Sequence, residues 1–212
     1  RVGVASKNIV VLNDTVAALA GGAFCYPGAA HRVLGLIVGT GTNMAAFVSS
    51  DRSARLRDAG FSGYCAINYE SGNFAPPHLS PWDAAVDARS DNPGRQRFEK
   101  AVSGHYLPQV YRELVGLDET PSSSAALDHE VTHSGPHAEQ ARALLDRSAH
   151  LVAAGLAAAY DQMEPGPLGV LAEGTLFWSN PRYREQVNAR LTELTGRTDV
   201  QILHRDDINF VG

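Results

Sequence analysis

The amino-acid sequence predicts an α/β fold, a mixed five-stranded sheet flanked by helices. Three observations support this class. Short apolar runs suited to strands alternate with longer segments that have the apolar spacing of helices. Two turns rich in glycine and threonine, residues 39–42 and 173–175, follow such runs. Polar side chains gather at the ends of the expected strands: Asp14, Asn43 and Glu70.

Composition narrows the class of protein further. At 212 residues the chain is long enough for one domain or two small ones. A net charge of −5 without a Lys/Arg cluster argues against a nucleic-acid surface, and no apolar run approaches the roughly 20 residues of a membrane span. Two cysteines, Cys25 and Cys65, are too few for a structural zinc site. We expect them to be buried free thiols in a reducing compartment, and therefore expect a cytoplasmic protein.

The first elements are expected to be a buried strand at residues 8–12 and a helix that begins after Asn13 and Asp14. Either side chain is a natural cap for this helix, and a cap is the simpler interpretation of the aspartate. Ligands of open α/β sheets bind at the carboxyl ends of strands, however, and Asp14 follows the expected strand directly. Pro27 and Gly28 should end the helix.

The next strand, residues 35–38, leads into Gly39, Thr40 and Gly41, and the apolar residues 44–48 follow at once. The simpler interpretation is a tight hairpin in which 44–48 is the return strand. The same turn also suits phosphate, because glycine lets the backbone approach closely and successive N–H groups and hydroxyls can donate to an anion. Both interpretations can hold together.

A polar surface loop is expected at residues 49–63, followed by a third strand at 64–70 that ends in Glu70. A carboxylate buried there without partners would cost free energy. Glu70 is therefore either a partly exposed side chain at the end of a strand or a group that binds a ligand. The residues alone leave both interpretations open.

Helices dominate the next part of the chain. Ser80 is expected to cap a helix in which Pro81 takes the first position. A longer helix begins at residues 95–104 and carries Glu99 next to the apolar Phe98. A solvent-exposed Glu99 is the simpler interpretation, and a place at the edge of a cleft is the alternative.

Residues 118–136 have the composition of a linker. His129, His133 and His137 are four residues apart, which is a spacing that metal-binding histidines use on a helix. Gly135-Pro136 would interrupt such a helix, so we expect a surface loop and no metal site.

The remaining elements follow in a regular order. A long helix is expected at residues 137–163, a fourth strand at 168–172, a helix that starts at Pro181, and a last strand at 200–203. The fourth strand ends in the small polar turn 173–175, which is similar to the first glycine-rich turn.

Several segments together resemble the hexokinases, sugar kinases built on the actin-like, ribonuclease-H-like fold. The resemblance extends over nearly the whole chain, in the family's order and spacing, and is weakest between residues 115 and 146. It implies that ATP and Mg²⁺ are used and that a hexose is the substrate. The segments that carry it are residues 12–16, 35–43, 67–70, 92–100 and 103–107.

The resemblance implies a role for each matching residue. Asp14 stands at the position of the catalytic base. Positions that contact the hexose are matched by Asn13, Asn43, Glu70 and Glu99. Positions that contact the phosphates and nucleotide of ATP are matched by Gly39, Thr40, Gly41, Gly104, Gly174 and Thr175. The helix around Arg147 and Ser148 would border the adenosine.

The resemblance also implies a domain division and shows where the sequence departs from the family. Residues 1–30 would be the end of the small lobe with a linking helix, and residues 31–212 the large lobe. Neither the family's N-terminal phosphate turn nor its Lys-bearing sugar loop is present, so we expect the natural N-terminus upstream and the small lobe of the same protein as a partner. Ser71 replaces an aromatic residue, and residues 206–209 replace a Gly/Ser-rich turn near the nucleotide.

These observations lead to one hypothesis and two alternatives. The parent protein is expected to transfer the γ-phosphate of ATP to the 6-hydroxyl of a hexose such as glucose, with Asp14 as base. The first alternative is a non-catalytic, sugar-binding regulator of the same fold, suggested by the replaced nucleotide turn. The second is an actin-fold phosphotransferase with a different acceptor.

Overall fold

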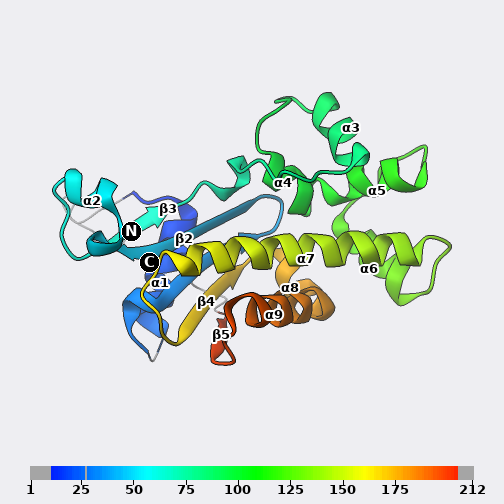
Figure 1. The fold of residues 1–212 in the computed structure, drawn as a ribbon. Coiled ribbons are helices and arrows are strands. Elements are labelled where there is room, and N and C mark those ends of the chain that lie inside the picture. The colour runs from blue at the N-terminus through cyan, green and yellow to red at the C-terminus, as the bar shows by residue number, and fades with distance from the viewer. Residues whose placement is uncertain (1–10, 27, 205–212) are drawn as a thin grey trace, which may run out of the picture.

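A computed structural model describes residues 11–26 and 28–204, and confirms the α/β class with one mixed sheet. The strand order is β3-β2-β1-β4-β5 (Figure 1). The pairs β1–β2 and β2–β3 are antiparallel, whereas β1–β4 and β4–β5 are parallel. The strands are β1 (Val33–Val38), β2 (Thr42–Ser49), β3 (Tyr64–Asn68), β4 (Leu168–Glu173) and β5 (Val200–Leu203).

Helices cover both faces of this sheet. The long helix α7 crosses one face with α9 beside it, and α1 packs on the other face (Figure 1). The helices are α1 (Asp14–Cys25), α2 (Ala54–Asp58), α3 (Pro81–Arg89), α4 (Arg97–Val102), α5 (Leu107–Val115), α6 (Ser124–Thr132), α7 (Ala138–Asp161), α8 (Thr175–Ser179) and α9 (Pro181–Thr195). Short 3₁₀ helices occur at Ala30–Arg32, Ser50–Arg52 and Ser71–Asn73. None of the helices in the described ranges is long and apolar enough to cross a membrane.

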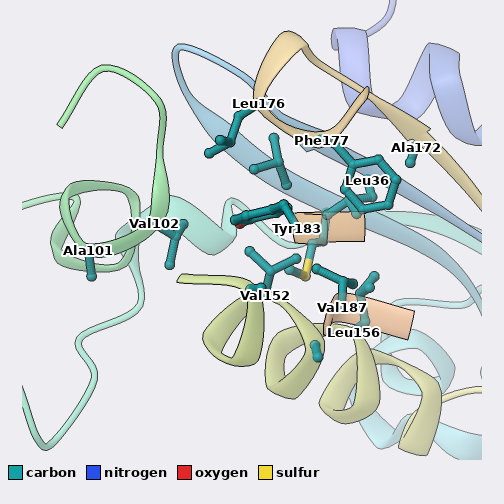
Figure 2. Close-up of a cluster of buried hydrophobic side chains, with 14 of the residues drawn as sticks. Leu36, Ala101, Val102, Val152, Leu156, Ala172, Leu176, Phe177, Tyr183 and Val187 are labelled. Atoms are coloured by element: carbon teal, nitrogen blue, oxygen red, sulfur yellow. The ribbon is translucent and has the colours of Figure 1, made fainter. Parts of the chain in front are cut away.

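The larger core lies between the sheet and the helices α7, α8 and α9. Figure 2 shows Val152 and Leu156 of α7 in one cluster with Leu36, Tyr183 and Val187. The period of the apolar residues in α7 explains this, because positions three and four apart fall on one face of a helix. Tyr183 is fully enclosed, and burial raises the pKa of its hydroxyl, which is hydrogen-bonded to Ser148 at 2.8 Å.

The smaller core joins α1 to the opposite face of the sheet. Ala18 and Leu19 pack there against Val33, Ala45 and Leu171. Close approach requires glycine at the crossing, because a Cβ at Gly35 would lie 2.8 Å from the carbonyl oxygen of Thr15. Gly22, further along α1, faces Val33, which precedes Gly35 in β1. Helix α1 therefore runs antiparallel to β1. The N-terminus of α1 therefore points toward the end of the sheet where β1 finishes.

The predicted hairpin is confirmed, with β1 and β2 paired and Gly39–Gly41 as its tip. The strand predicted at residues 8–12 is wrong where it can be seen: Val11 and Leu12 are exposed and belong to no strand. An apolar run becomes a buried strand only when it pairs, and the five strands of the described sheet pair with one another alone. Residues 8–10, Pro27 and 206–209 lie outside the described residues.

Two predicted loops contain helices instead. The segment 49–63 holds α2 and a 3₁₀ helix, capped by the hydroxyls of Ser53 and Ser49. The expected linker holds α6, which is anchored by the fully buried Leu127. His129 lies in α6, whereas His133 caps the end of that helix in a turn, and their rings stack at 3.9 Å. Both side chains are exposed, so the predicted surface position holds and the predicted loop is wrong for His129.

The helix predicted from residue 95 onward is divided into α4 and α5. The break falls at Gly104, whose backbone N–H donates to the carbonyl of Gly39 at 2.7 Å. A contact with the hairpin thus replaces the next helical hydrogen bond. The predicted third strand also ends earlier, at Asn68, and α8 follows the second glycine turn directly. Cys25 and Cys65 are half-buried rather than buried, and no disulfide joins these two described residues.

Candidate active site

Three glycine-containing segments meet at the carboxyl ends of the parallel strands β1 and β4. Ile37 pairs with Glu173 across these strands, so the turns that follow them lie side by side. A Cβ at Gly174 would lie 2.2 Å from the carbonyl oxygen of Val38, and one at Gly104 would lie 2.9 Å from that of Gly39. Only glycine allows such an approach, and the result is a small region walled by backbone.

The hairpin tip supplies donors to this region. The N–H of Gly39 closes the tip by donating to the carbonyl of Gly41 at 2.9 Å, and the amides of Thr40 and Gly41 donate to no group in the described chain. The side chain of Thr40 is exposed, as is that of Thr175 beside Gly174. Free backbone donors and hydroxyls at one point suit an anion such as phosphate.

Next to the tip, three polar side chains form a continuous hydrogen-bonded chain. Nδ2 of Asn43 donates to Oδ1 of Asn68 at 2.8 Å, and Nδ2 of Asn68 donates to Oε1 of Glu70 at 2.6 Å. Oδ1 of Asn43 accepts from the backbone N–H groups of Met44 and Ser71 at 2.8 and 3.1 Å. The structure therefore brings Asn43 and Glu70 together and fixes the orientation of the Asn43 amide.

Glu70 itself has an unusual backbone. Its φ of 48° lies in the left-handed region, which residues other than glycine seldom adopt. This conformation turns the chain out of β3 and into the 3₁₀ helix that follows. Glu70 is exposed, with its carboxylate held by Asn68.

Glu99 faces the same place from the first turn of α4. Its Oε2 accepts from the backbone N–H of Thr42 at 3.1 Å. A Cβ at Gly41 would lie 2.8 Å from that oxygen, and one at Gly72 would lie 3.3 Å from the Cβ of Glu99. Glu99 is half-buried against the hairpin tip. The simpler interpretation, a solvent-exposed side chain, is therefore wrong. The two glutamates and Asn43 therefore border one region.

Two ion pairs fix the short helix that carries Glu99. The ammonium of Lys100, whose side chain is only 2% exposed, donates to Asp87 at 2.6 Å and to the carbonyl of Asn92 at 2.8 Å. Arg147 donates to both carboxylate oxygens of Asp83, at 2.6 and 2.9 Å, and to the carbonyl of Ala101 at 3.2 Å. Helices α3, α4 and α7 are thereby joined.

These carboxylates are held in their charged form. Burial alone would raise the pKa of Asp83, but hydrogen bonds from Arg147 and Ser80 outweigh it and leave the pKa below its ordinary value. Burial would likewise raise the pKa of Asp87, and the hydrogen bond from Lys100 lowers it. Sequence reasoning missed Asn68, Lys100 and Asp87. Only Asn68 gave a signal, because it is a polar residue two positions before Glu70 in the segment 64–70 that the sequence predicts as a strand, where such residues share a face.

Asp14 approaches this end of the sheet from α1. Of the two residues predicted to cap α1, Asn13 and Asp14, the structure has Asn13 as the N-cap. Its Oδ1 accepts from the N–H of Thr15 at 2.9 Å. Oδ1 of Asp14 accepts from the N–H and the hydroxyl of Thr15, at 2.7 and 3.2 Å, and Asp14 is exposed. Asn43 lies on the sheet face that α1 covers, since it is paired with Ile37 two residues beyond Gly35.

The remaining residue expected near a nucleotide is enclosed. Ser148 is fully buried, and its hydroxyl bonds with Tyr183 and donates to the carbonyl of Val102 at 2.8 Å. It can stabilise the junction of α4, α7 and α9 but presents no group to a ligand. Arg147 beside it is engaged with Asp83.

Known proteins are similar to this chain over most of its length. The profile of a protein family described as Hexokinase matches residues 33–119 and 137–212. Hexokinase-3 of Homo sapiens is 30% identical over 249 aligned residues, which cover 94% of this chain and 26% of that protein. This chain thus spans about a quarter of the length of that curated relative.

Solved structures agree in fold. A crystal structure of a hexokinase superposes with a TM-score of 0.78 at 25% identity, covering 95% of this chain and 53% of that one. A hexokinase from Schistosoma mansoni superposes with a TM-score of 0.72 at 23% identity, covering 92% and 53% of the two chains, and supports the fold alone. The fold is the actin-like one that sugar kinases share, and with its profile match and its relatives this chain belongs to the hexokinase family.

Proposed function

We propose that this chain is the large lobe of an ATP-dependent hexokinase that transfers the γ-phosphate to the 6-hydroxyl of a hexose such as glucose. The observation that carries the proposal is the meeting of Asn43, Glu70 and Glu99 beside the Gly39–Gly41 turn. The hexokinase of Schistosoma mansoni with the same fold was crystallised in complex with glucose, which supports a hexose as the ligand.

The two glutamates suit the recognition of sugar hydroxyls. One oxygen of each carboxylate accepts from the protein: Oε1 of Glu70 from Asn68 and Oε2 of Glu99 from Thr42. The other oxygen of each has no protein partner among the described residues, so it remains available to accept from a hydroxyl. A site built from fixed acceptors rejects analogues that lack a hydroxyl, because a polar group is then left unpaired.

Asp14 is the proposed general base. A sugar hydroxyl is a weak nucleophile, so a carboxylate within hydrogen-bond reach must accept its proton as the phosphoryl group is transferred. One oxygen of Asp14 is fixed by Thr15 at the start of α1, and the residue is exposed at the end of the sheet where Asn43 lies. Asn13 would contact the sugar from the neighbouring position.

The glycine turns fit ATP. The free N–H groups of Thr40 and Gly41 could donate to phosphate oxygens, and Gly104 and Gly174 leave room for them because they carry no side chain. Gly39 and Thr175 complete this wall. Mg²⁺, held mainly by those phosphates, would supply the positive charge that offsets the charge on the transferred group. The protein's own contribution is position and hydrogen bonding.

We further propose the division into residues 1–30, which end the small lobe and link it, and residues 31–212, the large lobe. The small lobe of the same protein would close over the hexose and exclude water. A cytoplasmic location remains part of this proposal.

The experiment is a coupled assay of glucose phosphorylation with the whole protein that contains this chain. The Asp14→Ala variant is expected to lose at least ~10²-fold in kcat, the lower range for general-base catalysis, with glucose still bound. Asp58→Ala, which removes an exposed carboxylate from α2, serves as the matched control and should leave kcat unchanged. Near-normal turnover in Asp14→Ala would refute the role of this residue.

A further inference from the structure

Asn68, the last residue of β3, connects two of the proposed hexose-binding residues without being one of them. Its Oδ1 accepts from Nδ2 of Asn43 at 2.8 Å, and its Nδ2 donates to Oε1 of Glu70 at 2.6 Å. The backbone N–H of Glu70 donates to the same Oδ1 at 3.4 Å. Asn68 is half-buried, whereas Glu70 is exposed. The side chain of Asn68 therefore holds both residues from within the protein.

The direction of these hydrogen bonds is fixed from the backbone. The N–H groups of Met44 and Ser71 donate to one atom of the Asn43 amide, at 2.8 and 3.1 Å, and a backbone N–H can only donate. That atom is therefore the oxygen, and the NH2 group of Asn43 faces Asn68. Asn68 must then present its oxygen to Asn43 and its own NH2 group to Glu70. Turning the Asn68 amide over would oppose two NH2 groups at one end and two oxygens at the other, so only one orientation satisfies the chain.

This orientation decides what Asn43 and Glu70 can offer a hexose. Oδ1 of Asn43 is already engaged by two donors, so the second N–H of its amide is the group left for a ligand. Oε2 of Glu70 is bonded to no group among the described residues, and a carboxylate oxygen can only accept. A hydroxyl both donates and accepts, so one donor beside one acceptor suits a sugar hydroxyl.

Holding Glu70 in advance lowers the cost of binding a ligand. An exposed glutamate without a partner samples several rotamers, and fixing them when a ligand arrives costs affinity. The hydrogen bond from Asn68 restricts this side chain before any sugar is present. It is also charge-assisted, and such hydrogen bonds are roughly twice as strong as neutral ones. Asn68 is therefore placed to prepare the carboxylate for the hexose.

We propose that Asn68 is a positioning residue that sets the affinity for the hexose by fixing Asn43 and Glu70, and that it does not touch the sugar itself. This inference deepens the proposed function and rests on it, since it needs Asn43 and Glu70 to bind a hexose. Among the described residues, the hydrogen bonds of the Asn68 side chain reach neither Asp14 nor the Gly39–Gly41 turn. Loss of its amide should therefore raise KM for the hexose and leave kcat nearly unchanged.

The first test is Asn68→Asp in the whole protein that contains this chain. This change keeps the shape of the side chain and replaces its NH2 group by an oxygen, which at pH 8 would repel Oε1 of Glu70. KM for glucose should rise at least ~10-fold, the value of a hydrogen bond to a charged group, with kcat within about 3-fold of wild type. Asn188→Asp is the matched control, because it makes the same chemical change at an exposed position of α9 and should leave both constants unchanged.

The pH dependence distinguishes positioning from a merely structural role. Two neighbouring carboxyl groups retain one proton to a higher pH than an isolated carboxyl does, and that proton restores a donor between them. The loss of glucose affinity in Asn68→Asp, measured by calorimetry against wild type, should therefore shrink from at least ~10-fold at pH 8 to about 3-fold or less at pH 5. Asn68→Ala introduces no carboxyl and should lose affinity equally at both pH values. Comparison with wild type at each pH removes the effects of other titrating groups, Glu99 among them.

Three results would overturn the proposal: wild-type glucose affinity in both Asn68 variants at pH 8, a loss for Asn68→Asp that is equal at both pH values, or a loss that falls on kcat alone. Thermal unfolding without sugar verifies that each variant is folded. If Asn68→Asp does not fold at pH 8, KM and kcat of Asn68→Ala decide the proposal.

The same unfolding measurement separates this proposal from the proposed function. The unfolding temperature of Asn68→Asp should fall further below that of wild type at pH 8 than at pH 5, because the two carboxylates repel each other only when both are charged. If wild type does not bind glucose at all, the proposed function fails. The difference between the two pH values still decides whether Asn68 holds Glu70.

Discussion

Replacing Lys100 with Met isolates the buried ion pair that holds α4. The side chain of Lys100 is 2% exposed and that of its partner Asp87 is 20% exposed. Methionine keeps most of the packing volume and removes the charge, together with the hydrogen bonds to Asp87 and to the carbonyl of Asn92. The change therefore tests charge and hydrogen bonding rather than packing.

The structure sets the expected size of the effect. Removing one partner of a buried ion pair costs about 3–5 kcal/mol, because the other charge is left without compensation. Asp87 still accepts from the N–H of Gly94, at 2.9 and 3.1 Å, and can regain some water at its exposed edge. We therefore expect a loss at or just below the minimum of this range, ~2–3 kcal/mol in the free energy of unfolding.

The assay is urea unfolding followed by circular dichroism, with glucose affinity measured on the same samples by calorimetry. Glucose affinity should fall at least ~10-fold, because α4 carries Glu99 next to Lys100 and a charge-assisted hydrogen bond depends on its position. Arg190→Met is the matched control: it breaks an exposed pair with Glu193, worth no more than ~0.5 kcal/mol.

One result would refute this reasoning, namely a Lys100→Met variant as stable as Arg190→Met. A second variant sharpens the test. Replacing both partners, as in Lys100→Met with Asp87→Leu, should recover much of the lost stability, since an apolar pair of similar volume leaves no unpaired charge.

Three further outcomes are expected from the structure. The pKa of Asp83 is lowered below its ordinary value of 3.8, so its ion pair with Arg147 stabilises the fold above that pH, and this stabilisation is lost as the pH falls. Urea unfolding at pH 7, 4 and 3 should therefore show a steeper loss of stability for wild type than for Asp83→Asn. Parallel losses in the two proteins would contradict the stabilising role of this ion pair. Gly174→Ala forces a Cβ to within 2.2 Å of the carbonyl of Val38 at a φ of 109°, and should cost at least ~2 kcal/mol in urea unfolding and reduce ATP binding; a variant of normal stability would show that the two turns are not tightly packed. Leu156→Ala removes a fully buried side chain of the larger core and should cost ~2–5 kcal/mol, whereas Leu194→Ala at an exposed position of α9 should cost far less.

Much of the fold was accessible from the sequence because its signals are local. The hairpin was predicted from apolar runs on both sides of a glycine turn, and Ser80 with Pro81 identified the start of α3, where a capping box is found. Failures occurred where distant contacts decide. Leu127 makes α6 a helix by packing into the core, and Gly104 divides α4 from α5 by bonding to the hairpin. Neither contact can be predicted from the residues that are adjacent in the sequence.

The candidate site, like the fold, could be predicted from the sequence only in part. Residue types at the ends of predicted strands indicated Asn43 and Glu70, and the resemblance to the hexokinases added Glu99. The orientation of Glu99 was not predictable, because it depends on the N–H of Thr42, 57 positions earlier in the chain. Lys100 and Asp87 were missed because their charges are on helices, where the sequence pattern suggests exposure.

The left-handed backbone of Glu70 has a consequence for the evolution of this domain. At this φ a glycine would be unstrained, and the conformation costs other residues of the order of 1–3 kcal/mol. Glu70→Gly is therefore expected to give a more stable fold while removing a carboxylate from the proposed hexose site. Glu70 shares its left-handed φ with Gln96 and Ser134 among the described non-glycine residues, and it borders the proposed hexose site. Selection for stability alone would be expected to replace this glutamate with glycine.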